Sequence, residues 1–270
     1  MSRNADRACK LVAVLAVIAA SAGCTELDGR NRVRQGNKHF REQRPIDAIG
    51  EYEKALKAVQ SPTIHYNLGL AYSKIFKVGG DAKDKIKLGV KGELVCDQIP
   101  GVAFETQQVC IKPGDRRFDP CDEKNVCASS FKCEKVELCV GESGKLADMS
   151  AEHFGEWLKA NPKDAQTRGI MTQVWLDSSQ YKKAIDYWEG LLAAKPDDAD
   201  IMGSLAGINL KAGDWRKSIE WYTKVAELSK DPSAKVASYQ FIGNVAWAKL
   251  NSKSLTAAES IELADKGLGA

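Results

Sequence analysis

Residues 165–196 and 199–230 decide the fold, because they are two copies of one pattern. The first copy is AQTRGIMTQVWLDSSQYKKAIDYWEGLLAAKP and the second is ADIMGSLAGINLKAGDWRKSIEWYTKVAELSK. At a period of 34 residues, Tyr181 aligns with Trp215, Ile185 with Ile219 and Trp188 with Tyr222. In both copies the apolar residues have helical spacing on either side of a polar break, at 178–180 and at 212–214. Each copy therefore predicts two amphipathic helices.

This unit resembles the tetratricopeptide repeat. That family has a small residue where its two helices cross, an aromatic residue after the turn and often a proline at the end of the unit. Ala184, Tyr181 and Pro196 occupy these positions, and Pro162 precedes Pro196 by one period. The resemblance implies a mainly α fold, a TPR-like α-solenoid of about four to five helix pairs.

The same register extends toward the N-terminus. Gly36, Ala48 and Tyr52 predict a first repeat, and Tyr66–Tyr72 predicts the first helix of a second repeat. The second helix of that repeat is expected at Met149–Ala160, one period before the helix around Trp188. The second repeat is therefore expected to be split by an insertion.

The predicted organisation has four parts. Residues 1–23 are a signal peptide, 24–75 the lipidated N-terminus and the first repeat helices, and 76–144 an inserted cysteine-rich module. Residues 145–270 contain the second helix of the split repeat, further repeats and a C-terminal cap. The turn between two repeat helices tolerates such extra chain because it lies at the surface.

The inserted module holds six cysteines, and disulfides are expected for all of them: Cys96, Cys110, Cys121, Cys127, Cys133 and Cys139. An even, clustered set in an exported chain is typical of disulfides. The connectivity stays open, because six cysteines allow fifteen pairings. A zinc site is the alternative, since thiolates bind zinc.

The module is expected to have little regular structure or short β-strands. It has too few apolar residues to form a core unaided, so we expect reduction to unfold it and to spare the solenoid.

The N-terminus resembles a bacterial lipoprotein signal. Three basic residues precede the apolar run Leu11–Ala20, and small residues lead to Cys24. By this resemblance, cleavage follows Gly23 and Cys24 carries the lipid, although Ser21 stands where the family prefers leucine. Thr25 is not the aspartate that retains many lipoproteins at the inner membrane, so the outer membrane facing the periplasm is expected. An ordinary secretory signal is the alternative.

Charge excludes several classes of partner. Removing residues 1–23 takes three basic and one acidic residue from totals of 39 and 36, which leaves a net charge of +1. A nucleic-acid-binding protein usually has a basic stripe that neutralises phosphates, so no nucleic acid is expected. After Cys24 no apolar run approaches the length of about twenty residues that a spanning helix needs.

Neither a catalytic site nor a cofactor or metal site is expected. The three histidines, His39, His65 and His153, lie in three different predicted helices. His39 and His65 occupy repeat positions that usually pack, so we interpret them as core or helix-crossing residues. The protein is predicted not to be an enzyme.

A solenoid of helix pairs has a concave surface that is lined by the first helix of each repeat and accepts a peptide or a partner helix. By register this partner groove contains seven residues: Asn37, Arg41, Tyr66, Leu70, Gln173, Leu210 and Lys211. Simple surface exposure is the alternative for each of them.

These features predict a membrane-anchored periplasmic scaffold for protein–protein interaction. Family analogy alone suggests assistance to envelope assembly, as by pilotins or barrel-assembly components. One alternative is a glycan or small-ligand receptor that acts through the insert, and another is a structural spacer. The place of an exposed apolar patch discriminates between them, since a patch on the concave face favours peptide binding and one on the insert favours the receptor.

Overall fold

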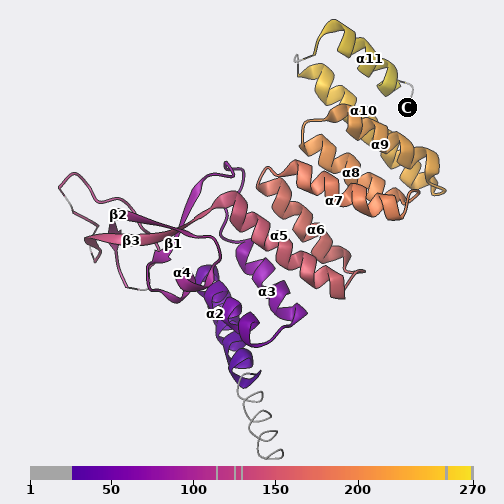
Figure 1. Ribbon diagram of the computed structural model, residues 1–270. Helices are drawn as coiled ribbons and strands as arrows, with labels where there is room; N and C mark the ends of the chain where they lie inside the picture. Colours follow the sequence, from indigo (N-terminus) through magenta and orange to yellow (C-terminus); the bar gives the residue numbers. More distant parts are fainter. Residues whose placement is uncertain (1–25, 114, 125, 129, 253–254, 269–270) are drawn as a thin grey trace, which may run out of the picture. The chain divides into compact units, whose positions relative to one another are not determined.

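The computed structural model describes residues 26–268 except 114, 125, 129, 253 and 254 (Figure 1). The signal peptide and Cys24 lie outside the described residues. The chain divides into two compact units, residues 1–178 and 179–270.

Five helices of more than ten residues lie in the described part of the first unit. Residues 26–41 form the first helix, and four others follow: α2 (Pro45–Ala58), α3 (Pro62–Tyr72), α5 (Ser143–Ala160) and α6 (Ala165–Asp177). Proline at the first helical position begins α2 and α3, where its missing N–H costs nothing. α6 begins at Asp164, whose side chain accepts a hydrogen bond from the Thr167 backbone N–H.

Two glycines allow the helices of this unit to pack closely. A Cβ atom on Gly36 would lie 2.4 Å from the ring of Tyr52, which is buried on α2. A Cβ atom on Gly69 of α3 would lie 2.7 Å from the ring of Phe154 on α5, which is fully buried. Both sites need glycine because the aromatic ring occupies the space of a side chain.

α3 and α5 pack together although about seventy residues separate them in the sequence. The Ser150 hydroxyl donates a hydrogen bond to the Gly69 carbonyl at 2.8 Å. The ring of Tyr66 lies against the rings of Phe154 and Trp157. The two helices run antiparallel, because the start of α3 faces the end of α5. All three strands of the protein's sheet lie between these helices in the sequence.

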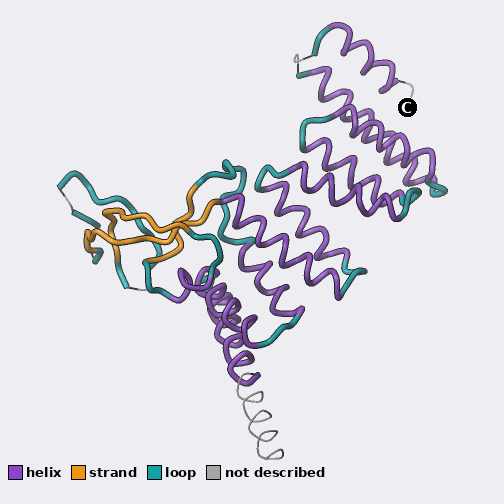
Figure 2. The backbone as a smooth tube through the Cα atoms, viewed as in Figure 1, coloured by secondary structure: helices purple, strands orange, loops and turns teal. Residues whose placement is uncertain are grey.

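The sheet is antiparallel in the order β1-β3-β2. Figure 2 draws its strands in orange. Its strands are β1 (Lys85–Val90), β2 (Ala103–Ile111) and β3 (Lys132–Glu142), and the short helix α4 (Leu94–Gln98) follows β1. β3 pairs with both neighbours and leads directly into α5.

The insert contains a small hydrophobic cluster in addition to its three disulfides. Val109, Phe118, Leu138 and Val140 are buried together. The alternation of side chains along paired strands brings these residues to one face, although they are far apart in the sequence.

The insert also contacts the helix α2, so it is not an isolated module. A Cβ atom on Gly50 of α2 would lie 3.3 Å from Leu94 of α4, which shows how closely the two helices approach. The Lys57 ammonium donates a hydrogen bond to the Gln98 side chain at 2.6 Å. Folding of the insert is therefore coupled to α2.

The second unit consists of helices that pack in sequence order. They are α7 (Tyr181–Ala194), α8 (Ala199–Lys211), α9 (Trp215–Leu228), α10 (Pro232–Asn251) and α11 (Ala257–Leu268). The side chains of Asp198, Asp214 and Asp231 accept backbone hydrogen bonds at the starts of α8, α9 and α10. One core cluster joins the last three helices: Trp215, Ile219, Ile242, Val245, Ala246 and Leu263.

The polar breaks predicted in the two repeat copies fall between helices. α6 ends at Asp177 and α7 begins at Tyr181, while α8 ends at Lys211 and α9 begins at Trp215. Gly213 has a φ of +89°, a conformation that glycine adopts without strain. In the described part of the chain, no helix combines the length and the apolar character needed to cross a bilayer.

Candidate functional site

The predicted groove residues of the N-terminal helices differ in their surroundings. Asn37 accepts hydrogen bonds from the Tyr52 hydroxyl at 2.7 Å and from the Asn67 amide at 3.3 Å. It is half-buried, whereas Arg41, one turn further along the same helix, is exposed. Asn37 therefore links the first helix to α2 and α3.

The remaining groove residues are partly accessible. Tyr66 and Leu70 are half-buried on α3, and Gln173 is exposed on α6, where its amide donates to Asp177. Leu210 and Lys211 are exposed at the end of α8 in the second unit. The partner groove stays a prediction for all seven residues.

Two histidines that lie far apart in the sequence meet between α3 and α5. The Nδ1 atoms of His65 and His153 are 2.9 Å apart, so one ring donates a hydrogen bond and the other accepts it. The ring of His153 stacks on that of Tyr72. Its Nε2 atom lies 3.5 Å from Glu53 of α2, which also accepts a hydrogen bond from the Tyr72 hydroxyl at 2.9 Å.

This polar cluster was missed at the sequence level, although the repeat register held the necessary signal. The register assigns Tyr66–Tyr72 and Met149–Ala160 to one helix pair, and each histidine lies in or beside one of those segments. Their packing role agrees with the interpretation of His65 as a helix-crossing residue. The cluster ties α2, α3 and α5 together.

The surroundings favour the neutral forms of His65 and Tyr72. Burial and the neighbouring His153 lower the pKa of His65 below its usual 6.5. Glu156 and Glu53 raise this pKa and Lys159 lowers it, but the net shift is downward. Burial also raises the pKa of Tyr72, with Glu53 adding to the effect. Glu53 thus faces a phenol that stays protonated.

We expect acid to weaken this packing. Because the folded-state pKa of His65 is lowered, its neutral form contributes stability above the unfolded pKa, and that contribution is lost as the pH falls through the folded pKa. The thermal midpoint should therefore decrease as the pH is lowered from about 7 to about 5, the range in which histidines usually titrate. In His65→Gln the fall should be smaller.

Circular dichroism melts across that range would measure the effect, with His39→Gln as the matched control, because His39 lies outside the cluster. Equal pH dependence in wild type and His65→Gln would contradict the assignment.

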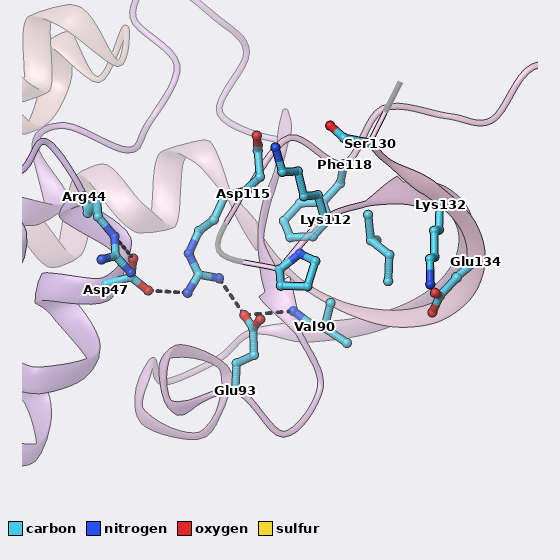
Figure 3. Close-up of a pocket in the computed structure, with 13 residues that line it drawn as sticks. Arg44, Asp47, Val90, Glu93, Lys112, Asp115, Phe118, Ser130, Lys132 and Glu134 are labelled. Carbon is cyan, nitrogen blue, oxygen red and sulfur yellow. Dashed lines mark hydrogen bonds and ion pairs between the residues drawn. The ribbon is translucent and has the colours of Figure 1, made fainter. Parts of the chain in front are cut away.

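A cavity of about 390 Å³ lies between α2 and the insert (Figure 3). Arg116 lines this cavity. Its guanidinium donates hydrogen bonds to the Leu88 carbonyl at 2.9 Å, to the Glu93 carboxylate at 2.6 Å and to the Asp47 carboxylate of α2. The Arg44 guanidinium also donates to Asp47, at 2.9 Å. Lys132 and Glu134 lie at the other end of the cavity.

Burial raises the pKa of Asp47. The hydrogen bonds and positive charges of Arg116 and, to a smaller extent, of Arg44 have a larger opposite effect, so the net shift of the pKa is downward. Asp47 is therefore ionised and paired. Its role here is to hold the insert on α2, because breaking a half-buried ion pair leaves a charge without its partner.

All six predicted cysteines form disulfides. The pairs are Cys96–Cys139, Cys110–Cys127 and Cys121–Cys133. The sulfur atoms of Cys110, Cys121 and Cys127 lie within 4.8 Å of one another, which is the grouping a zinc site would use. Sulfur in a disulfide carries no thiolate, so this group would bind a metal only after reduction.

The comparison with protein families matches the repeat region. Residues 176–234 match the tetratricopeptide repeat model. This segment contains α7, α8 and α9, so the observed helices and the family match agree on a TPR-like, mainly α fold with a small disulfide-bonded sheet. Tetratricopeptide repeats are in general protein-interaction scaffolds.

Several solved structures are similar to this chain. MamA from Desulfovibrio magneticus RS-1, residues 41 to the end, is 16% identical over 90% of this chain and 96% of that chain, with a TM-score of 0.40. YrrB, described as a TPR protein with an unusual peptide-binding site, is 11% identical over 86% of this chain and 88% of that chain, with a TM-score of 0.38. No protein in the curated set matches the chain.

Proposed function

We propose that this protein is a lipid-anchored scaffold of the bacterial envelope, which binds a protein partner through its C-terminal helices. The repeat fold supports a role in protein–protein interaction in general. We propose further that the protein is lipid-anchored, faces the periplasm and helps to assemble an envelope complex.

An exposed apolar stripe on α10 carries the proposal. Its members are Val236, Tyr239, Trp247 and Leu250, and their spacing follows one face of the helix. Trp247 is 70% exposed and Val236 is 55% exposed. Large exposed apolar residues gathered on one face mark an interaction site more often than chance exposure.

The charges on α10 indicate the kind of partner. The helix carries Lys235 and Lys249 but no acidic residue. A partner with an apolar face flanked by acidic residues would complement it, since opposite charges favour the encounter and fix the register.

Substitutions on the stripe test this function. We expect Val236→Glu with Trp247→Glu to abolish recovery of a specific partner when the protein is purified from crosslinked cells. Val126→Glu is the matched control, because Val126 is an exposed apolar residue of the insert. Loss of the partner in the control variant, with retention in the stripe variant, would refute the proposal.

The anchor is supported by the signal sequence and by the three disulfides, which are typical of an oxidising compartment. A lipid-modified Cys24 with a further chain on its amine would hold the protein almost permanently, since two or more chains exceed the marginal binding of one.

Cys24→Ala should therefore move the protein from the membrane fraction to the soluble fraction, or leave it unprocessed. Labelling with a fatty-acid analogue measures the modification directly. An unlabelled wild-type protein would show that Cys24 is not acylated.

The cavity beside the insert favours a second candidate function, that of a small-ligand receptor. Its volume suits a small molecule, and it combines apolar Val90 and Phe118 with charged side chains. A glycan array on the full mature chain, compared with a Lys132→Ala variant, tests this role, because Lys132 lines the cavity and is exposed. Selective binding that the variant loses would favour the receptor over the scaffold.

A further inference from the structure

A second surface of the C-terminal unit is hollowed. An open groove of about 560 Å³ lies along α7 and α9, which are the second helices of their pairs. Its apolar lining consists of Leu192, Ala193, Pro196, Met202, Trp221 and Leu228. The predicted partner groove lies on the first helices of the repeats and shares none of these residues.

The groove is built by the local packing of three helices. α8 packs against both α7 and α9, and its Met202 is buried at the base of the groove. Trp221 and Leu228 are two turns apart on α9 and so lie on one face of it. Leu228 is 44% exposed, although the groove around it is apolar.

The rim of the groove carries two acidic residues, Glu189 and Asp197. The Glu189 carboxylate also interacts electrostatically with Lys182 of the same helix. The only cationic lining residue in the described chain, Lys224, has its ammonium 4.2 Å from the centre of the Trp221 ring. Lys224 is therefore held by a cation–π contact.

We infer that this groove binds a short peptide segment in which an apolar side chain stands next to lysine or arginine. The apolar side chain lies over Met202 between Leu192 and Trp221, and the basic side chain pairs with Glu189 or Asp197. Aromatic and flexible methionine surfaces accept varied apolar side chains, while the carboxylates select the charge. The inference rests on the proposed function, since it names a second class of partner for the same scaffold.

The test uses the full mature chain and two sets of short fluorescent peptides. Each set varies the central apolar residue, and the flanking residues are lysine in one set and glutamate in the other. Fluorescence anisotropy measures binding. We expect the best lysine peptide to bind at least about tenfold more tightly than its glutamate counterpart, a difference of about 1.4 kcal/mol.

Two variants locate the binding site. Leu228→Lys should weaken binding of the lysine peptide about tenfold, and Glu189→Lys with Asp197→Lys should reverse the charge preference. Ile261→Lys is the matched control, because Ile261 is exposed on α11, outside the groove. Circular dichroism of each variant establishes that it is folded.

Each outcome decides the inference. No peptide binding, equal binding of both sets, or binding unchanged in Leu228→Lys would overturn it. A wild-type chain that instead self-associates, and loses this in Leu228→Lys, would make a second copy the occupant and would equally overturn it. Partner recovery that depends on the α10 stripe would survive all these results, so failure of the groove is distinguishable from failure of the proposed function.

Discussion

Phe154→Ala should lower the free energy of unfolding of the first unit by about 3–5 kcal/mol, the cost typical of removing a buried phenylalanine. Phe154 is fully buried, and its ring occupies the space that the missing side chain of Gly69 leaves open. The ring therefore joins α3 to α5 across the insert. The cavity left by alanine cannot close easily, because α3 and α5 are also fixed to each other by the His65–His153 contact.

Urea titration followed by circular dichroism measures this effect. Trp247→Ala is the control, since Trp247 is mostly exposed and its replacement should change stability by no more than about 0.5 kcal/mol. A loss of less than about 1 kcal/mol in Phe154→Ala, where core truncations usually cost more, would contradict the packing of α3 on α5.

Removing the Cys96–Cys139 disulfide should cost more than removing Cys121–Cys133. The two bonds close loops with sequence separations of 43 and 12 residues. In the chain-entropy account the two disulfides stabilise the fold by about 4 and about 3 kcal/mol, respectively, because a longer loop restricts the unfolded chain more. The first bond also joins α4, which packs on α2, to β3, which leads into α5.

The measurement compares two double variants, Cys96→Ala with Cys139→Ala and Cys121→Ala with Cys133→Ala. The first should unfold at the lower urea concentration and should also loosen α2, since the insert contacts that helix. Hydrogen exchange in α2 reads out this coupling. Unchanged hydrogen exchange in α2 would support the expectation that the insert can unfold while the repeat helices stay folded.

The repeat copies at 165–196 and 199–230 were enough to predict the TPR-like fold, because helical periodicity and the polar breaks are local features of the sequence. α7, α8 and α9 fall where that register requires. The even, clustered set of cysteines, in a chain expected to be exported, likewise predicted disulfides, since their formation depends on cysteine number and redox state rather than on fold.

Features that depend on contacts between distant residues were not predictable. The disulfide pairs and the core around Leu138 follow from the strand order β1-β3-β2, which no local pattern encodes. The apolar groove beside Trp221 likewise depends on how helices pack. The apolar stripe on α10 was visible only once exposure distinguished it from core.

Site-specific photo-crosslinking in intact cells tests most directly the claim that the C-terminal helices bind the partner. A photoreactive amino acid would replace Trp247 on α10 in one strain and Phe104 of the insert, which is also exposed, in another. Our account predicts a discrete crosslinked partner from position 247 and none from position 104. A partner captured only from position 104 would contradict it and would assign binding to the insert.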